Sequence, residues 1–272
     1  MESPSFKPDA GACDCHAHIY EDKYPLAPTA SFKPPHAPVS DYRAVQRALG
    51  IERVIVVQPT GYGFDNTCAE DALKQFGESA RGICVVPTNV SDAELNRLHA
   101  AGFRGVRYMM LGGLLPWDSL PSMAARIAPL GWNINLQLDG RDLPLHAAMI
   151  SSLPCKVVID HTGKFLEPVG VETQAFMTLL KLLDGGRVWI KLSAPYETSR
   201  TGAPDYNDVS TLARALALAH PDRCLWASNW PHPNQSPLPS NAAMLDLLLK
   251  WTDDAGTRRK ILVENPAALY GF

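Results

Sequence analysis

The strongest constraint on the fold is a regular alternation of short apolar segments and amphipathic segments along the chain of 272 residues. Eight segments have the length and the β-branched, apolar composition of strands: residues 12–19, 53–60, 82–88, 105–110, 133–138, 156–161, 188–193 and 224–230. Each is followed by a segment with helical apolar spacing, at residues 41–49, 67–76, 92–101, 119–128, 143–152, 172–183, 208–219 and 241–252. Strands that alternate with helices pair in parallel, and eight such units close into a barrel. We therefore predict an α/β fold, a single (β/α)8 TIM-barrel domain over residues 1–272.

Two segments lie outside this repeat. The proline-rich stretch 24–38 follows the first strand, so we expect a long first βα loop over the barrel mouth. The helical segment 257–270 follows the eighth unit, and we expect it to pack under the barrel as a C-terminal helical tail. An open doubly wound sheet is the alternative fold, but its first strand is normally followed by a glycine-rich turn. Here that turn reads YEDK at residues 20–23, which favours the barrel.

Composition narrows the class of partner. Hydrophobic residues make up 46% of the chain, enough for a large core, and the formal net charge is −3 without any run of lysine or arginine. Nucleic acids and anionic membranes are therefore poor candidate partners. No apolar run approaches the roughly 20 residues that cross a bilayer, and the first residues lack the apolar core of a secretory signal. We expect a cytoplasmic protein, a monomer or a small homo-oligomer, whose six cysteines are reduced and buried.

Polar residues gather at the C-terminal ends of all eight predicted strands, whereas strand starts and middles are apolar. In chain order they are His16, His18, Gln58, Thr60, Thr88, Asn89, Arg107, Gln137, Asp139, Asp160, His161, Lys191, Ser193, Ser228, Asn229 and His232. One such residue is usually a satisfied buried group, but a whole set at one end of a barrel indicates a catalytic or binding mouth. His16 and His18 are the most specific members, because residues i and i+2 of a strand share a face. Asp14, inside the first strand, is expected to be a buried, hydrogen-bonded group of the barrel interior.

Five motifs carry a family resemblance: GACDCHAH at 11–18, PPHAPV at 34–39, GVR at 105–107, DHTG at 160–163 and NWPHPN at 229–234. Together they resemble the amidohydrolase superfamily, in its branch of small lactone-processing enzymes. The resemblance covers nearly the whole chain. It implies a barrel enzyme that acts on the carboxylic ester bond of a lactone, with His16, His18, His161 and the residue at position 229 as catalytic residues.

The eighth strand departs from the pattern of the superfamily. That strand normally ends in an aspartate, the general base that activates the hydrolytic water, whereas this chain has Asn229. A carboxamide cannot accept a proton at neutral pH, so water attack driven by this residue is excluded. The hydrolases of the branch also carry arginines where this chain has Gly113 and Glu197, although Arg107 remains. A dianionic substrate would therefore lose two of its guanidinium partners.

Other segments resemble the lactone isomerases of the same branch. They are the QLDG segment at 137–140, the LGG segment at 111–113, the HTGKF segment at 161–165 and the YETSR segment at 196–200. Those isomerases lack the first histidine of the His-x-His pair, which this chain keeps as His16. Both classes therefore stay open.

Metal binding is a second open question. His16, His18 and His161 offer three nitrogen ligands to one zinc ion, with a free position for water. Asn229 would be a weaker, uncharged fourth ligand. The fourth strand ends without a lysine for a bridging carbamate, which argues against two metals. The resemblance implies metal-free chemistry, so we expect no cofactor and keep a single zinc as the alternative.

The leading hypothesis is acyl transfer at a small lactone that bears one carboxylate. Arg107 would bind the carboxylate in a bidentate pair, and the three histidines would stabilise charge on the carbonyl oxygen. The other candidate substrate-binding residues are Gln137, Asp139, Tyr196, Thr60 and His232. A histidine or Asp139 is the candidate base for water. We expect hydrolysis first, intramolecular lactone isomerisation as the alternative, and a non-catalytic small-molecule binder as the lesser alternative.

Overall fold

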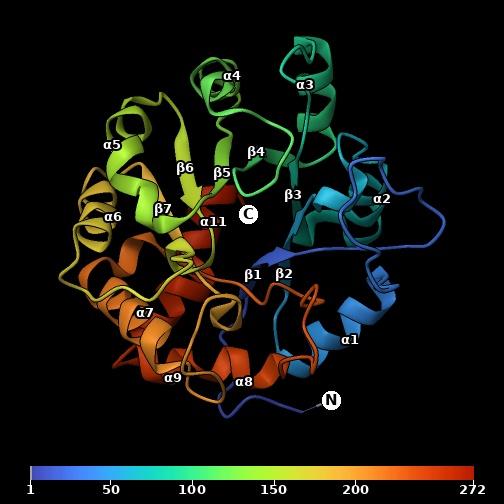
Figure 1. Cartoon of the computed structure of the whole chain (residues 1–272). Coiled ribbons are helices and arrows are strands. Elements are labelled where there is room, and N and C mark those ends of the chain that lie inside the picture. The colour runs from blue at the N-terminus through green and yellow to red at the C-terminus, as the bar shows by residue number, and fades with distance from the viewer. Residues whose placement is uncertain (1) are drawn as a thin grey trace.

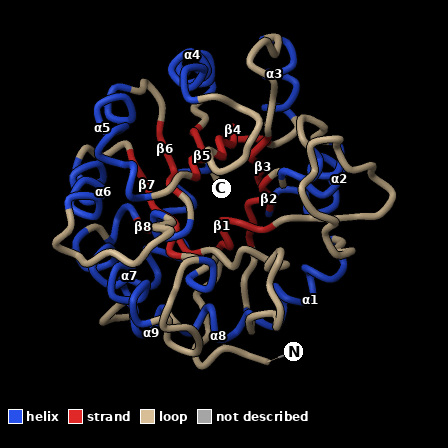
Figure 2. Tube along the Cα trace, viewed as in Figure 1, coloured by secondary structure: helices blue, strands red, loops and turns tan. Residues whose placement is uncertain are grey.

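The structure is a computed structural model that describes residues 2–272. Its eight strands form one parallel sheet in chain order, curled into a ring at the centre of the molecule (Figures 1 and 2). They are β1 (Cys13–Ala17), β2 (Arg53–Val57), β3 (Ala80–Cys84), β4 (Phe103–Met109), β5 (Asn133–Gln137), β6 (Lys156–Ile159), β7 (Val188–Leu192) and β8 (Cys224–Trp226). The predicted (β/α)8 barrel is confirmed.

The ring closes at a seam between the first and the last strand. Ala17 and Trp230 form a parallel bridge just beyond β8. The Asn229 N–H donates to the His16 carbonyl at 2.9 Å, and the His18 N–H donates to the Trp230 carbonyl at 2.8 Å. The backbones of three predicted site residues therefore join the two ends of the barrel.

Helices surround the ring, as Figure 1 shows. They are α1 (Val39–Leu49), α2 (Thr67–Phe76), α3 (Asp92–Ala100), α4 (Leu120–Ile127), α5 (Leu143–Ser152), α6 (Gln174–Asp184), α7 (Asn207–Ala219), α8 (Asn241–Asp246) and α9 (Leu248–Trp251). The apolar spacing predicted these positions well, but the last predicted helix is divided at Leu247 into α8 and α9. Within residues 2–272, no helix combines the length and the apolar composition that crossing a bilayer requires.

The chain ends in a helical tail that closes the bottom of the barrel. It comprises α10 (Ala255–Arg259), a π-helical turn (Lys260–Glu264) and α11 (Asn265–Tyr270). The wide turn lies just before Pro266, whose missing N–H interrupts the regular helical bonding pattern. Tyr270 packs with Cys13 and Cys15 inside the barrel, and the Phe272 ring lies 4.6 Å from the Arg81 guanidinium. Figure 1 places this end of the chain at the barrel axis, as the sequence predicted.

The strands end earlier than predicted, because the backbone leaves the extended conformation as it reaches the mouth. β8, for example, ends at Trp226 instead of residue 230. Seven non-glycine residues of the mouth have a positive φ, between 45° and 63°: His161, Thr162, Lys164, Ala194, Asn229, His232 and Asn234. Such residues are uncommon outside functional sites, where the surrounding structure holds them in place.

Strand β1 contains an irregularity that regular alternation does not predict. Its register against β2 shifts between Asp14 and Ala17, so that Cys15 packs in the barrel interior while the next residue, His16, also contacts interior groups. Asp14 is buried and hydrogen-bonded, but the expectation that it belongs to the interior is wrong. Its carboxylate accepts from the Tyr42 hydroxyl of α1 at 2.8 Å, on the outer side of the strand.

The long first βα loop lies between β1 and α1. Its ends are paired, since Tyr20 and Ala37 exchange backbone hydrogen bonds of 3.0 and 2.7 Å. Ser31 and Phe32 of this loop reach the pocket at the barrel mouth, as expected. All six cysteines are buried and free, also as expected.

Candidate active site

A pocket of about 590 Å³ lies at the C-terminal ends of the strands. Its lining residues are His18, Tyr20, Ser31, Phe32, Pro59, Thr60, Arg107, Met109, Gln137, His161, Lys164, Glu197, Asn229, Pro233 and Asn234. Six of the predicted site residues are therefore brought together: His18, Thr60, Arg107, Gln137, His161 and Asn229. The other four, His16, Asp139, Tyr196 and His232, lie outside this lining.

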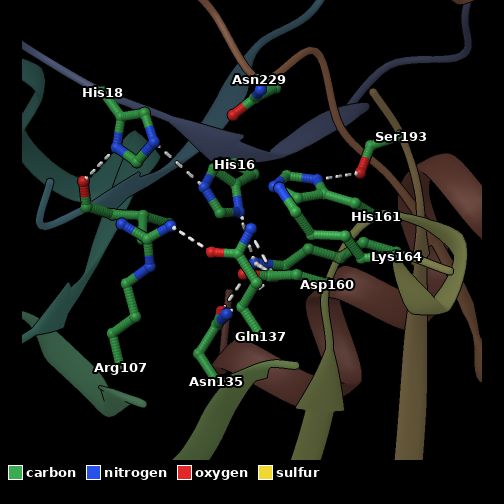
Figure 3. Close-up of polar contacts among 12 residues, drawn as sticks. His16, His18, Arg107, Asn135, Gln137, Asp160, His161, Lys164, Ser193 and Asn229 are labelled. Atoms are coloured by element: carbon green, nitrogen blue, oxygen red, sulfur yellow. Dashed lines mark hydrogen bonds and ion pairs between the residues drawn. The ribbon is translucent and has the colours of Figure 1, made fainter. Parts of the chain in front are cut away.

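His16 lies directly behind His18, in a cluster of buried polar groups. Figure 3 shows the imidazoles of His16, His18 and His161 grouped together, with Asn229 above them and Arg107 and Gln137 below them in that view. His16 Nε2 and His18 Nε2 are 3.2 Å apart. The ring centroids of His16 and His161 are 4.9 Å apart. The three predicted catalytic histidines thus form one group.

A buried ion pair supports this group from below. Lys191 of β7 lies with its Nζ 3.0 Å from Asp160 Oδ1, at the end of β6. The same Nζ donates to Asn135 Oδ1 at 2.6 Å and to His16 Nδ1 at 3.0 Å. Burial alone would raise the pKa of Asp160, but Lys191 and His16 outweigh it and hold that pKa well below its usual value. The side chains of Lys191 and Asp160 are both completely buried.

These contacts fix the protonation of two histidines. An ammonium group can only donate, so His16 Nδ1 accepts from Lys191 and the neutral ring carries its proton on Nε2. That N–H donates to His18 Nε2. His18 Nδ1 in turn donates to the Val57 carbonyl at 2.7 Å. The result is one directed chain of hydrogen bonds from Lys191 to the wall of the pocket.

All three histidines are neutral at neutral pH. Burial lowers the pKa of His18 to about 3 and that of His161 to about 4, and it lowers the pKa of His16 as well. His161 lies in the 3-10 turn η6 (His161–Gly163), directly after β6. Its Nδ1 contacts the Ser193 hydroxyl at 2.9 Å. Nε2 of His161 is therefore the ring nitrogen of the three histidines left to face a ligand.

Arg107 places a buried positive charge on the opposite side of the pocket. Its side chain comes from β4, and the residue is 5% exposed. It donates to the Gln58 carbonyl at 3.0 Å and to Gln137 Oε1 at 3.3 Å. Its Nε–H has no partner. Among residues 2–272, no carboxylate forms an ion pair with it, although a buried charge normally needs one.

Asn229 joins a second polar group at the rim of the pocket. Its Nδ2 donates to Glu197 Oε1 and to the Tyr196 hydroxyl, both at 3.0 Å. The other Glu197 oxygen pairs with Lys164. The Tyr196 hydroxyl also contacts His232 Nδ1 at 2.9 Å. Tyr196 and His232 therefore support Asn229 from behind the pocket.

Asp139 lies apart from this group. Its carboxylate pairs with the Arg141 side chain at 2.6 Å and accepts from the backbone N–H groups of Arg141 and Leu166. These bonds hold the turn after β5. The carboxylate that lines the pocket is that of Glu197.

Two charged lining residues, Lys164 and Glu197, were absent from the predicted site. Both follow strand ends by a few residues, in turns with positive φ at Lys164 and at Ala194. The sequence did carry a signal for Glu197, because it stands where hydrolases of the branch have an arginine. That reversal of charge indicated the loss of a contact with substrate, but it did not show that Glu197 itself contacts Asn229 and Lys164 at the pocket.

Three residues form a candidate metal site, but their polar contacts compete with a metal ion. One ligand atom each from His16, Asp160 and His161 lies within 4.8 Å of the others, which is the geometry of a candidate site. However, the Lys191 ammonium contacts both His16 and Asp160 at 3.0 Å. His16 Nε2 carries a proton, and the lone pair of His18 Nε2 accepts it, so the His-x-His pair has no free nitrogen to offer.

Fold and pocket define a (β/α)8 enzyme with its site at the C-terminal ends of the strands. The family model described as Amidohydrolase matches residues 13–272. The chain is 37% identical to a 2-pyrone-4,6-dicarboxylate hydrolase of Comamonas testosteroni, over 98% of this chain and 92% of that protein. It is 34% identical to a D-galactarolactone isomerase of Agrobacterium fabrum, over 96% and 91%.

A solved structure agrees with these matches. The apo structure of ATU3138 from Agrobacterium tumefaciens superposes with a TM-score of 0.94 at 33% identity, covering 99% of each chain. The chain therefore belongs to the amidohydrolase family, and it is an enzyme of that family. The resemblance predicted from the five motifs is confirmed.

Proposed function

We propose that this enzyme opens the ring of a small lactone that bears one carboxylate, by histidine-assisted acyl transfer without a metal ion. The observation that carries the proposal is Arg107, a buried guanidinium with neutral partners and a free Nε–H beside the histidines. A carboxylate of the substrate would supply the missing counter-charge through a charge-assisted hydrogen bond. Relatives at 37% and 34% identity, a pyrone dicarboxylate hydrolase and a galactarolactone isomerase, act on carboxylated lactones.

The charges that line the pocket favour a substrate with one carboxylate. Lys164 and Glu197 form an ion pair and cancel. Arg107 remains, with a net charge of +1 on the lining. A dicarboxylate would leave its second charge facing the Glu197 carboxylate, which is unfavourable in a partly buried site. This supports a monoanionic lactone over a dianionic pyrone.

The histidines would act on the reacting carbonyl group. His161 Nε2 faces the pocket, and the Ser193 hydroxyl can donate to Nδ1 and so keep the proton on Nε2. A neutral imidazole N–H placed at the carbonyl stabilises the negative charge that develops on that oxygen. His16 and His18 would complete the polar wall through their chain of hydrogen bonds to Lys191.

Hydrolysis is the first candidate reaction, and isomerisation is the second. The His-x-His pair and the identity to a lactone hydrolase support hydrolysis. Asn229 favours isomerisation, because its two amide N–H groups donate to Glu197 and Tyr196 and it has no basic atom for water. In isomerisation a hydroxyl of the substrate attacks the carbonyl, and the ring is relocated without water.

Turnover in ¹⁸O-labelled water separates the two reactions. Purified enzyme is incubated with D-galactarolactone and with 2-pyrone-4,6-dicarboxylate, and the products are analysed by mass spectrometry. One ¹⁸O atom in the product carboxylate supports hydrolysis. An isomeric lactone without label supports isomerisation, and no turnover of any carboxylated lactone refutes the proposed function in favour of a binding protein.

A further inference from the structure

We propose that Glu197 is the residue that takes up and returns the proton in this ring-opening step, in place of the aspartate that β8 lacks. The proposal rests on the lactone chemistry proposed above. Glu197 ends the 3-10 turn η7 (Pro195–Glu197), which follows β7. It is the one carboxylate among the residues that line the pocket within the described range 2–272.

The carboxylate is held in place but still has capacity to accept a proton. Oε1 accepts from Asn229 Nδ2 at 3.0 Å, and the other oxygen pairs with Lys164. An ionised carboxylate has about four lone-pair sites, so two contacts leave acceptor positions free. The side chain is 16% exposed, toward the same pocket as His161 and Arg107. A substrate hydroxyl or a water in the pocket can therefore reach it.

Glu197 explains why an amide, Asn229, follows β8. A carboxylate can only accept, so the amide N–H2 of Asn229 must face Glu197. An aspartate at position 229 would place a second negative charge in contact with Glu197, and one of the two carboxylates would have to bind a proton. Only one of the two positions, 197 and 229, can therefore hold an ionised carboxylate. In this chain the charge is on the loop after β7 instead of the end of β8.

Glu197 is also ionised at neutral pH, the state in which it can accept a proton. Burial alone would raise its pKa, but His161, Lys164 and Asn229 outweigh that effect and hold the pKa below its usual value. The other candidates for a base are less well placed. Both nitrogens of His18 are engaged, and Asp139 is bound by Arg141 outside the pocket.

The proton balance is simple in both reactions. The attacking O–H gives its proton to Glu197 while its oxygen bonds to the carbonyl carbon. The intermediate then collapses, the ring C–O bond breaks, and the departing oxygen takes the proton back from Glu197. If the attacking group is a hydroxyl of the substrate, the product is an isomeric lactone. If it is water, the product is a hydroxy acid, and Glu197 ends unchanged in both cases.

Substitution of Glu197 tests the proposal with D-galactarolactone as the first probe. Glu197→Gln is isosteric and keeps an oxygen for Asn229, and we expect its kcat to fall by about 10²–10⁴-fold with little change in KM. Glu197→Ala leaves space beside Lys164, and we expect added formate to restore part of its kcat. Glu167→Gln, an exposed carboxylate paired with Arg200 at 3.0 Å, is the matched control and should keep wild-type kcat. Circular dichroism verifies that each variant is folded.

The outcomes separate this proposal from the proposed function. If the wild-type enzyme is active and its Glu197→Gln variant keeps its kcat, or changes only in KM, the role of Glu197 is overturned and the proposed function stands. Failure of formate to act on Glu197→Ala does the same. A wild-type enzyme that turns over no carboxylated lactone overturns both. In the double variant Glu197→Gln/Asn229→Asp the carboxylate returns to the end of β8, and turnover above that of Glu197→Gln is expected.

Discussion

Replacing Lys191 with methionine tests the buried charge at the centre of the site. Methionine keeps most of the length and volume of the side chain but removes the ammonium group. The change leaves the buried Asp160 carboxylate without the cation that lies 3.0 Å from its Oδ1. It also leaves Asn135 Oδ1 and His16 Nδ1 without their donor. We expect a marked loss of stability, with the protonation of His16 no longer fixed.

The expected size of the loss follows from the burial of the pair. Removing one partner of a buried ion pair costs about 3–5 kcal/mol, because the other charge remains buried and uncompensated. Asp160 Oδ2 already has no partner, so the remaining protein offers little relief. Each 1 kcal/mol shifts Tm by about 2–4 °C in chains of 150–250 residues, and the lower value applies to this longer chain, which gives a decrease of roughly 6–10 °C.

Thermal unfolding followed by circular dichroism measures the effect. Lys181→Met, at an exposed lysine of α6, is the matched control and should melt like the wild type. The double variant Lys191→Met/Asp160→Asn removes both charges and should regain most of the lost Tm. In Lys191→Met the pKa of Asp160 rises, because the charge that most strongly opposes the effect of burial is lost. The difference from wild type should therefore be larger at pH 8, where the carboxylate is charged, than at pH 5.

Two results would refute this reasoning. A Lys191→Met variant that melts with the wild type at pH 8 would mean that the ion pair contributes nothing to stability. A double variant whose loss of stability equals the sum of the losses of the two single variants would mean that the two groups are not energetically coupled as a pair.

Two further predictions concern pH and the anion site. The pKa of His161 is about 4 when folded and 6.5 ordinarily, so the unfolded chain binds more protons between these values. The free energy of unfolding should be highest above pH 6.5 and should fall by roughly 3 kcal/mol, because of this residue, as the pH drops from 6.5 through 4. Urea titrations at several pH values measure this change, and a flat profile from pH 7 to 5 would contradict it. Arg107→Met should lower kcat/KM at least about 30-fold, from the loss of 2–5 kcal/mol of anion binding, yet raise Tm, since a buried unpaired charge disappears. Steady-state kinetics and thermal unfolding check both, and an unchanged kcat/KM would show that Arg107 does not bind the substrate.

Most of the fold could be predicted because its signals are local and repeated. Each strand is a short apolar run and each helix has its own apolar face, so every βα unit can be predicted from its own residues alone. The strand ends were predicted too long because the mouth residues keep an apolar or β-branched composition while the backbone turns. Asn229 and His161 have positive φ, a conformation that their neighbours in space enforce and that their sequence does not announce.

The site could be predicted as a set of residues but not as a set of contacts. His18, Arg107, His161 and Asn229 do meet around one pocket. The sequence gives no sign that Lys191, on a strand far along the chain, donates to His16. Such a contact depends on the register of seven strand pairs around the barrel. For the same reason the sequence left a single zinc ion open as the alternative, because it does not show the lysine that sets the positions of the protons on His16 and His18.

The seam between β1 and β8 gives this arrangement a consequence for folding. Asp14 accepts from the Ser228 N–H across 214 positions of the chain, and the backbones of His16 and Asn229 bond at the same place. Contacts between such distant residues form late, because the cost in chain entropy of closing the loop comes before the gain. Chemistry and closure therefore depend on the same few residues. A chain whose ends have not yet met has its histidines but no pocket for them, so the first turnover of substrate would also mark the moment at which the barrel is complete.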